Sequence, residues 1–156
     1  MSGSISEIRV EGVRTLTKVR LALDGLTVLV GDNGSGKSTL LECCELLRRA
    51  ASPTFFQELH DVHGGLGELL RVGSPHVRLG ARIVPASGPT LDYELALARD
   101  GADTIVDEER LVEVSTQNTW ILTRTRASAQ IRGEHGAAVA VPSIPRDRLL
   151  LTAFGL

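Results

Sequence analysis

GDNGSGKST, residues 31–39, matches the phosphate-loop pattern G-x-x-x-x-G-K-[ST] and directly follows the apolar run Leu26–Val30. The bare pattern also describes a glycine-rich turn that caps a helix. Its context is more specific, because nearly every residue of 26–30 is apolar, as in a strand covered on both faces. A helix is expected from about residue 36 to residue 50, with Leu40, Cys44 and Leu47 on one face. A strand, a glycine-rich loop and a helix in this order predict a nucleotide-binding site.

The residue types of the loop suit a bound triphosphate. Glycines at 31, 34 and 36 let the backbone turn its N–H groups toward phosphates, and the following helix directs its positive end to the same place. We expect Lys37 to bind the β- and γ-phosphates and Ser38 to bind Mg²⁺ through its hydroxyl. The expected cofactors are ATP and Mg²⁺. The expected nucleotide-binding residues of the loop are Asn33, Gly34, Ser35, Gly36, Lys37, Ser38 and Thr39.

Composition describes one soluble domain of ordinary size. The chain has 156 residues, of which 42% are hydrophobic and 23% charged. No apolar run approaches the roughly 18 residues of a membrane span, and the N-terminus has no signal-peptide pattern, so we expect a cytoplasmic protein without a membrane partner. The net charge of -2 gives no overall basic field for nucleic acid. Cys43 and Cys44 have no partner at metal-ligand spacing and are expected to be small, buried or half-buried fillers.

Three strands are expected before the phosphate loop. Ile8 and Val10 alternate with charged residues in the segment 5–11, and a second alternating strand follows at about 18–23. Asp24-Gly25 then predicts a tight turn before the apolar run that precedes the loop.

The pattern changes after the main helix. Ser52-Pro53 ends that helix, and Ser52 is expected to be the N-cap of a short helix over about 54–60, followed by a glycine-rich loop at 61–67. Alternating residues from about 76 to 141, with a hairpin at Asp100-Gly101, predict antiparallel strands. We therefore expect an α/β fold with a mixed sheet, one main helix after the phosphate loop and an antiparallel β meander.

This order of features resembles the opening of ABC-type ATPases of the SMC and RecF-like kind, within the AAA family. In those proteins a "-FRSL-" turn precedes "-NGSGKST-LL-", as Val13-Arg14-Thr15-Leu16 precedes GDNGSGKSTLLE here. The resemblance covers residues 5–49 best, and Val13 stands where the family has an aromatic residue. It implies the P-loop NTPase fold and makes Arg14 a candidate contact to the nucleotide, the alternative for Arg14 being a solvated turn arginine. In whole proteins of this family two heads sandwich ATP, and hydrolysis serves DNA repair, chromosome handling or defence against phage.

Three motifs that this family carries further along its chain have no convincing match before Leu156: the LSGG-type signature, a strand ending in Asp-Glu and a switch histidine. We therefore expect residues 1–156 to form a single incomplete ATPase domain, the N-terminal lobe. Hydrolysis would then need a complementary C-terminal half or partner subunit, and a nucleotide-dependent homodimer is a further expectation. DNA is a partner by resemblance only. The alternatives are a catalytically inactive regulatory subunit and a small-molecule kinase, which would continue with alternating strands and helices.

Residues 104–108 have the form of a strand ending in the acids Asp107 and Glu108, which could bind Mg²⁺ and activate water. The Asp100-Gly101 hairpin makes this strand antiparallel, whereas such an acid normally ends a parallel strand beside the phosphate loop, so a solvated strand end is the favoured interpretation. The other polar candidates also have ordinary structural interpretations. They are Gln57 or Gln117 as a magnesium-sensing glutamine, His60 and His63 as zinc ligands, Trp120 as a base-stacking platform, and Arg124, Arg126 and Arg132 as phosphate-backbone contacts.

Overall fold

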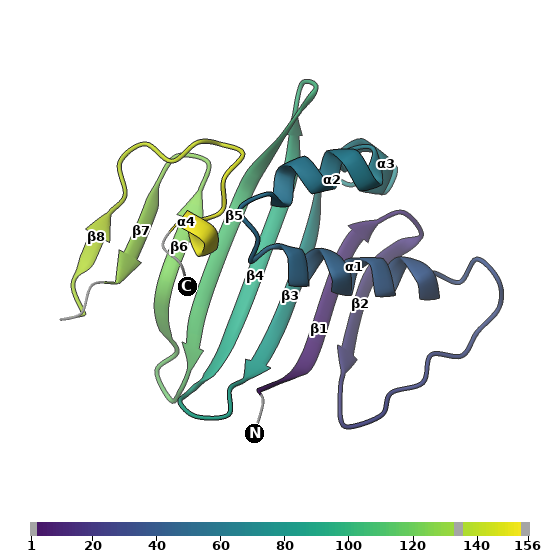
Figure 1. Ribbon diagram of the computed structural model, residues 1–156, viewed down its shortest axis with the longest axis horizontal. Helices are drawn as coiled ribbons and strands as arrows, with labels where there is room; N and C mark the ends of the chain where they lie inside the picture. Colours follow the sequence, from purple (N-terminus) through teal and green to yellow (C-terminus); the bar gives the residue numbers. More distant parts are fainter. Residues whose placement is uncertain (1–2, 133–135, 154–156) are drawn as a thin grey trace.

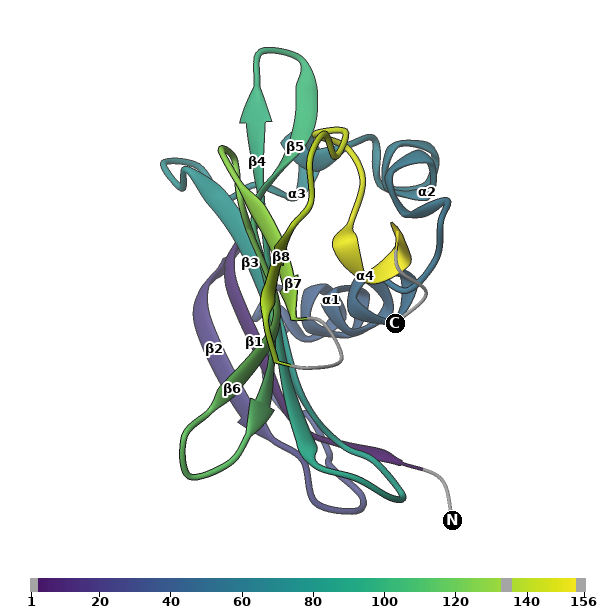
Figure 2. The same cartoon turned by 90° about the vertical axis from the view of Figure 1, so that its left-hand side faces the viewer.

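The computed structural model describes residues 3–132 and 136–153. One eight-stranded antiparallel sheet, with the strand order β2-β1-β3-β4-β5-β6-β7-β8, forms its frame (Figure 1). All four helices lie on the same face of this sheet (Figure 2). The strands are β1 (Ser4–Val13), β2 (Leu16–Ala22), β3 (His76–Val84), β4 (Thr90–Asp100), β5 (Asp103–Val114), β6 (Thr119–Thr125), β7 (Ala129–Arg132) and β8 (Ala138–Ala140). The helices are α1 (Lys37–Arg49), α2 (Phe55–His63), α3 (Leu66–Leu69) and α4 (Leu150–Ala153).

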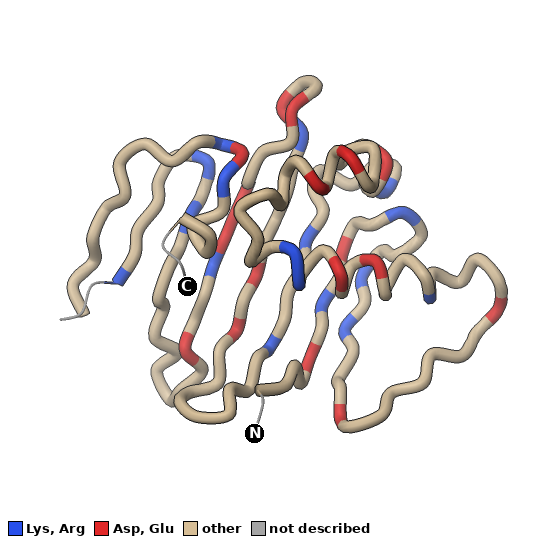
Figure 3. The backbone as a smooth tube through the Cα atoms, viewed as in Figure 1, with Lys and Arg blue, Asp and Glu red and all other residues tan. Residues whose placement is uncertain are grey.

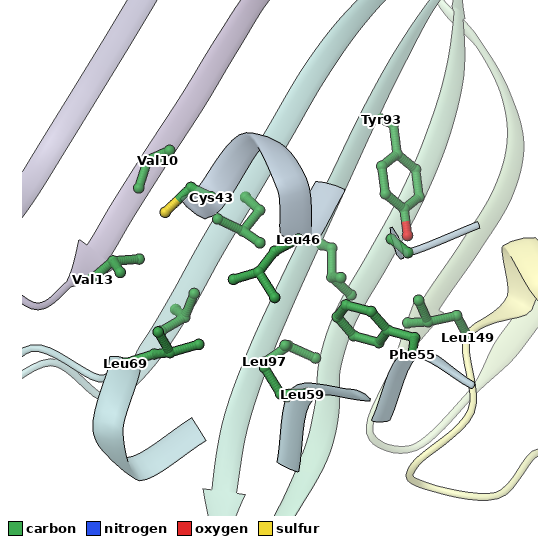
Figure 4. Packing of buried hydrophobic residues seen from close by; sticks show 14 of the residues in the cluster. Val10, Val13, Cys43, Leu46, Phe55, Leu59, Leu69, Tyr93, Leu97 and Leu149 are labelled. Carbon is green, nitrogen blue, oxygen red and sulfur yellow. The ribbon is translucent and has the colours of Figure 1, made fainter. Parts of the chain in front are cut away.

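The hydrophobic core fills the space between the helices and the inner face of the sheet (Figure 4). Tyr93, Leu95 and Leu97 of β4 belong to this core, and Ala96 and Ala98 are buried as well, so this part of the strand is covered on both faces. On α1 the buried face includes Cys43 and Leu46. It is rotated by about one residue from the expected face, whose Cys44 and Leu47 are only partly buried. This burial anchors α1, and therefore the loop before it, to β1 and β3.

The outer face of the sheet is polar, and its charges are largely paired. Arg9 of β1 contacts Glu7 at 2.8 Å and Asp92 of β4 at 2.5 Å. Arg20 of β2 reaches Glu7 at 2.8 Å, and Arg82 of β3 reaches Asp92 at 3.2 Å. Figure 3 shows that basic and acidic residues are interspersed along these strands. The outer face therefore presents charges of both signs and no single-sign field.

The expected strand at 26–30 does not form, and this prediction is wrong for the structure. Its residues run through an extended loop beyond the edge strand β2 (Figure 1). Leu26, Val28 and Val30 are 90%, 71% and 91% exposed, while Leu29 packs against the core. A strand needs a neighbouring strand to pair with its N–H and C=O groups. In the described part of the chain the edge strand β2 pairs only with β1, so the segment 26–30 has no partner. The sheet is consequently antiparallel throughout these residues, where a mixed sheet was expected.

The antiparallel strands follow the sequence pattern, whereas the short helices differ from it in detail. The antiparallel region expected from about 76 to 141 is confirmed as β3 to β8. The short helix begins at Phe55 with Thr54, instead of Ser52, at the N-cap position, and it continues to His63. Part of the expected glycine-rich loop forms α3. Within residues 3–132 and 136–153, no helix has the length and apolar character needed to cross a membrane.

Candidate nucleotide-binding site

The phosphate loop leads directly into α1. Gly34 and Gly36 have φ angles of 81° and 94°, in the left-handed region that glycine adopts without a Cβ clash. Gly36 is the N-cap of α1, and no side chain caps this end of the 13-residue helix. Residues 31–35 are exposed. The first N–H groups of a long helix therefore open at an exposed glycine-rich loop, which is the usual arrangement for binding a phosphate group.

Lys37 folds back over this loop. Its Nζ donates hydrogen bonds to the carbonyl oxygens of Gly31 at 2.6 Å and Asp32 at 2.7 Å, and it lies 3.4 Å from Ser35 Oγ. The side chain thus places a positive charge within the turn of the loop, beside the start of α1. An ammonium group at this position adds its charge to the positive end of the helix.

The other expected loop residues lie around Lys37. Asn33 occupies the exposed turn of the loop, which is closed by a hydrogen bond from Ser35 N–H to the Asp32 carbonyl at 3.2 Å. Ser38 is exposed and Thr39 is half-buried in the first turn of α1. The structure therefore brings the predicted phosphate-binding and metal-binding groups to one place.

The loop is packed against the turn between β1 and β2. A Cβ atom at Gly36 would lie 2.4 Å from Leu16 Cδ2 and 3.2 Å from Thr15 Oγ1. Arg14, in the same turn, has a φ of 45°, and its N–H donates to the Leu69 carbonyl at 2.8 Å. A positive φ in a residue with a side chain is strained and persists only where the surroundings fix it. The turn is thus held rigidly next to the phosphate loop.

The Arg14 guanidinium is bound to Glu42 of α1. Its Nη1 and Nη2 donate to the two carboxylate oxygens at 2.5 and 3.2 Å, and its Nε donates to the Glu68 carbonyl at 3.2 Å. His63 Nδ1 lies 2.7 Å from the same carboxylate. Arg14 and His63, two separate candidates of the sequence, therefore meet at Glu42, which sequence reasoning missed. A signal was present, because Glu42 lies four residues after Ser38, the expected Mg²⁺ ligand, and therefore on the same face of α1.

Asp107 and Glu108 lie on β5, away from the phosphate loop. Asp107 forms an ion pair with Arg126, and Glu108 contacts Arg78 of β3 at 2.8 Å on the outer face of the sheet. β3 and β4 separate β5 from β1, the strand whose turn contacts the loop. Three strand spacings amount to about 14 Å. The favoured interpretation, a solvated strand end, is wrong in detail, because both acids lie within β5, which continues to Val114, and both are paired with arginines. Their distance from the loop gives no support to a catalytic role.

Apart from His63, the glutamine and histidine candidates lie on the exposed surface. Gln57 on α2 and Gln117 between β5 and β6 are both exposed. His60 is exposed and lies 3.6 Å from Asp61. In the part of the chain that the structure describes, no group of three His, Cys, Asp or Glu side chains could hold a metal ion.

The arginines of the later strands have structural partners. Arg132 lies over the ring of Trp120, 5.1 Å from its centroid. Arg124 is buried, contrary to the expected solvated face, because its guanidinium donates to the carbonyl oxygens of Pro145, at 2.9 Å, and Arg148. These partners are loop residues far along the chain, which strand alternation does not reveal.

Comparisons with known proteins agree with this geometry. Residues 26–126 match the family described as "AAA domain, putative AbiEii toxin, Type IV TA system". Among solved structures, a similar one is that of the recombination mediator protein RecF with ATP, in the RecFOR pathway. The identity is 23% over 67% of this chain, with a TM-score of 0.50, and the chain spans 27% of the RecF chain. No curated protein matches the chain.

The similarity to RecF shows the fold, and it confirms the expected resemblance to RecF-like P-loop ATPases at that level. The family match extends from the segment before the phosphate loop to the end of β6 and covers more than half of the 156 residues. The chain therefore belongs to this family of AAA domains.

Proposed function

We propose that the chain binds ATP together with Mg²⁺ as the N-terminal lobe of an ABC/SMC-like ATPase, and that rapid hydrolysis requires groups outside residues 1–156. The observation that carries the proposal is the position of Lys37. Its ammonium lies 2.6 and 2.7 Å from two carbonyl oxygens of the glycine-rich loop, at the uncapped start of α1. A positive side chain and open helix N–H groups together suit a chain of phosphates.

The donor set also suits Mg²⁺. The exposed Ser38 hydroxyl offers one neutral oxygen ligand next to Lys37. Mg²⁺ usually keeps several waters and takes phosphate oxygens as further ligands, so one hydroxyl from the loop is a sufficient protein contribution for nucleotide binding. When bound, the ion would neutralise phosphate charge, while Lys37 and the backbone N–H groups hold the nucleotide in place.

The proposed need for a complementary half or partner subunit rests on two observations. Asp107 and Glu108, the acids that could activate water, are paired with arginines on β5, about three strands from the loop. The segment 26–30, next to the phosphate loop, has strand character but no strand partner in the described part of the chain, and its alternate apolar side chains are exposed. We propose that the complementary part supplies both the missing acid and the strand that pairs with this segment.

The experiment is an ATP hydrolysis assay on the purified 156-residue chain and its Lys37→Ala variant, with Mg²⁺. We expect both proteins to release phosphate at the background rate, although the unaltered chain binds ATP. Substantial hydrolysis that Lys37→Ala abolishes would contradict the need for a complementary half. Asp107→Asn and Glu108→Gln variants would then identify the acid, because only the substitution of the residue that activates water would lower the rate of hydrolysis. If both residues are structural, neither substitution changes the rate.

A further inference from the structure

Three side chains from three different segments meet beside the phosphate loop. Arg14 comes from the turn between β1 and β2, Glu42 from α1, and His63 is the last residue of α2. Glu42 Oε1 lies 3.2 Å from Arg14 Nη2 and 2.7 Å from His63 Nδ1, and Oε2 lies 2.5 Å from Arg14 Nη1. One carboxylate therefore joins two segments that are separated by about fifty residues of sequence.

The guanidinium of Arg14 is fixed at two edges and keeps donors for a further anion. Glu42 takes one N–H each from Nη1 and Nη2, and the Glu68 carbonyl takes the Nε–H. A guanidinium has five N–H donors, so two remain without an acceptor in the described part of the chain. The Arg14 side chain is 39% exposed, so those donors are not enclosed by protein.

The position of Arg14 relative to the loop is fixed by the backbone. The next two residues, Thr15 and Leu16, have the side-chain atoms that a Cβ at Gly36 would meet. Arg71 also donates to the carbonyl oxygens of Arg14 and Thr15, at 3.2 and 3.3 Å. The Arg14 side chain is itself long and flexible, and Glu42 limits its freedom by a two-point ion pair.

Glu42 is in turn held by His63. The Glu42 side chain is 23% exposed and the His63 side chain 8% exposed, so their contact lies mostly out of water. A contact with a buried ring fixes the orientation of the carboxylate toward Arg14. Glu42 in this position can prepare Arg14 for binding. The two-point contact already restricts the rotamers of the Arg14 side chain, so less side-chain entropy is lost when a ligand binds.

We propose that Glu42 is a positioning residue for nucleotide binding, which holds the Arg14 guanidinium ready to donate to the phosphate oxygens of ATP, and that His63 keeps Glu42 in this orientation. The inference rests on the proposed function, because it assumes that the phosphate loop binds ATP. It assigns Glu42 and His63 roles that neither the loop pattern nor the family match contains.

The test is a double-mutant cycle in ATP affinity, measured by titration calorimetry with Mg²⁺ on the full 156-residue chain. We expect Arg14→Ala and Glu42→Ala each to weaken ATP binding about tenfold, since each loses the charge-assisted contact. The double variant should also be weaker by only about tenfold, because Glu42 acts through Arg14. His63→Ala should weaken ATP binding about threefold. Added to Glu42→Ala, it should cause no further loss of affinity, because His63 acts through Glu42.

Glu45 provides the matched control. It lies on the same helix and also forms ion pairs with arginines, Arg48 and Arg49, at 2.6 and 2.7 Å. Glu45→Ala removes a comparable charge without touching Arg14, and we expect it to leave ATP affinity unchanged. Glu42→Gln keeps the shape of the side chain but not its charge, so it tests the role of Glu42 if Glu42→Ala fails to fold. We expect Glu42→Gln to weaken ATP binding about fivefold.

The outcomes separate this inference from the proposed function. If the unaltered chain binds ATP, Lys37→Ala loses binding, and the Glu42 variants bind like the unaltered chain, the inference is overturned and the proposed function stands. A double variant weakened about a hundredfold, the product of two independent effects, would also overturn it. If the unaltered chain does not bind ATP, both proposals are wrong.

Discussion

The Glu109 carboxylate of β5 accepts a 2.6 Å hydrogen bond from the backbone N–H of Leu150, at the start of α4. Its second oxygen accepts the N–H of Leu151 at 3.0 Å and the hydroxyl of Tyr93 at 3.2 Å. Glu109 has no exposed surface, and its cross-strand neighbour Arg124 is 5% exposed. A buried carboxylate in the sheet therefore fixes the segment that follows β8 against the core.

Replacing Glu109 with alanine is expected to lower the free energy of unfolding by about 3 kcal/mol, because it leaves buried donors without an acceptor and removes the negative charge that acts most strongly on Arg124. Urea unfolding followed by circular dichroism measures the change. Glu108→Ala is the control, since Glu108 is the preceding residue and its side chain is 43% exposed. Its expected cost is below about 1 kcal/mol. Equal losses in the two variants would show that the Glu109 contacts are not a main anchor.

The pH dependence of stability should report the same carboxyl group. Burial raises the pKa of Glu109 above its ordinary value of 4.5, against the opposing effect of the hydrogen bonds from Leu151, Leu150 and Tyr93 and the charge of Arg124. In the folded state Glu109 therefore keeps its proton at a pH at which the unfolded chain has already lost the proton from this carboxyl group. The contribution of Glu109 to stability is therefore largest below pH 4.5 and is lost as the pH rises toward the raised pKa.

Glu109→Gln cannot titrate at this position and supplies the reference. We expect the unfolding free energy of the unaltered chain, minus that of Glu109→Gln, to decrease as the pH rises from about 4.5. All other ionisable groups are shared by the two proteins and cancel in the difference. A difference that increases with pH over this window would mean that the folded state binds the ionised carboxylate more tightly than water does.

Gly36→Ala should abolish ATP binding and destabilise the fold. The residue has a φ of 94°, and a Cβ there would lie 2.4 Å from the buried Leu16 side chain. Gly25→Ala is a matched control outside the loop, because its φ is 60° and, among the described residues other than its two chain neighbours, no atom lies within 4 Å of an added Cβ. In both variants the positive φ of an alanine lowers the free energy of unfolding by about 1–2 kcal/mol. Only Gly36→Ala adds the collision between its Cβ and Leu16. Retained ATP affinity in Gly36→Ala would show that the loop moves freely away from the β1–β2 turn.

Cys43 is expected to resist alkylation in the native protein. Burial raises the pKa of its thiol to about 12, and the side chain has no exposed surface. At about pH 8 the reactive thiolate is then roughly one part in ten thousand. Mass spectrometry after iodoacetamide treatment, with and without urea, measures the protection. Modification of Cys43 at the same rate under both conditions would contradict the packing of α1 on the sheet.

Local signals in the sequence identified the phosphate loop, α1 and the antiparallel strands. The positive-φ glycines, the helix start at Lys37 and the alternation in β4 each depend on residues close in the chain. The face of α1 was predicted one residue away from its observed position, because Cys43 and Cys44 have the same character and only the packing against β1 and β3 distinguishes them.

Long-range contacts account for what the sequence left unpredicted. The apolar segment 26–30 has strand character, but strand formation depends on a neighbour, and the described sheet places none beside it. Glu42 and His63 are 21 residues apart, so their contact follows from how α2 folds back on α1. Arg124 is buried because the residues around Pro145 fold over β6, which the alternation within β6 does not indicate.

Calorimetric titration of the 156-residue chain with ATP and Mg²⁺, compared with its Lys37→Ala variant, tests the central claim most directly. Lys37→Ala removes the ammonium that lies within the loop and leaves the backbone turn in place. We expect the unaltered chain to bind one ATP, and Lys37→Ala to bind at least about a hundredfold more weakly or not detectably, since a phosphate–ammonium contact within a phosphate loop is lost. Equal affinity of the two proteins, or no heat of binding from a folded unaltered chain, would contradict the assignment of residues 31–39 as a nucleotide-binding site.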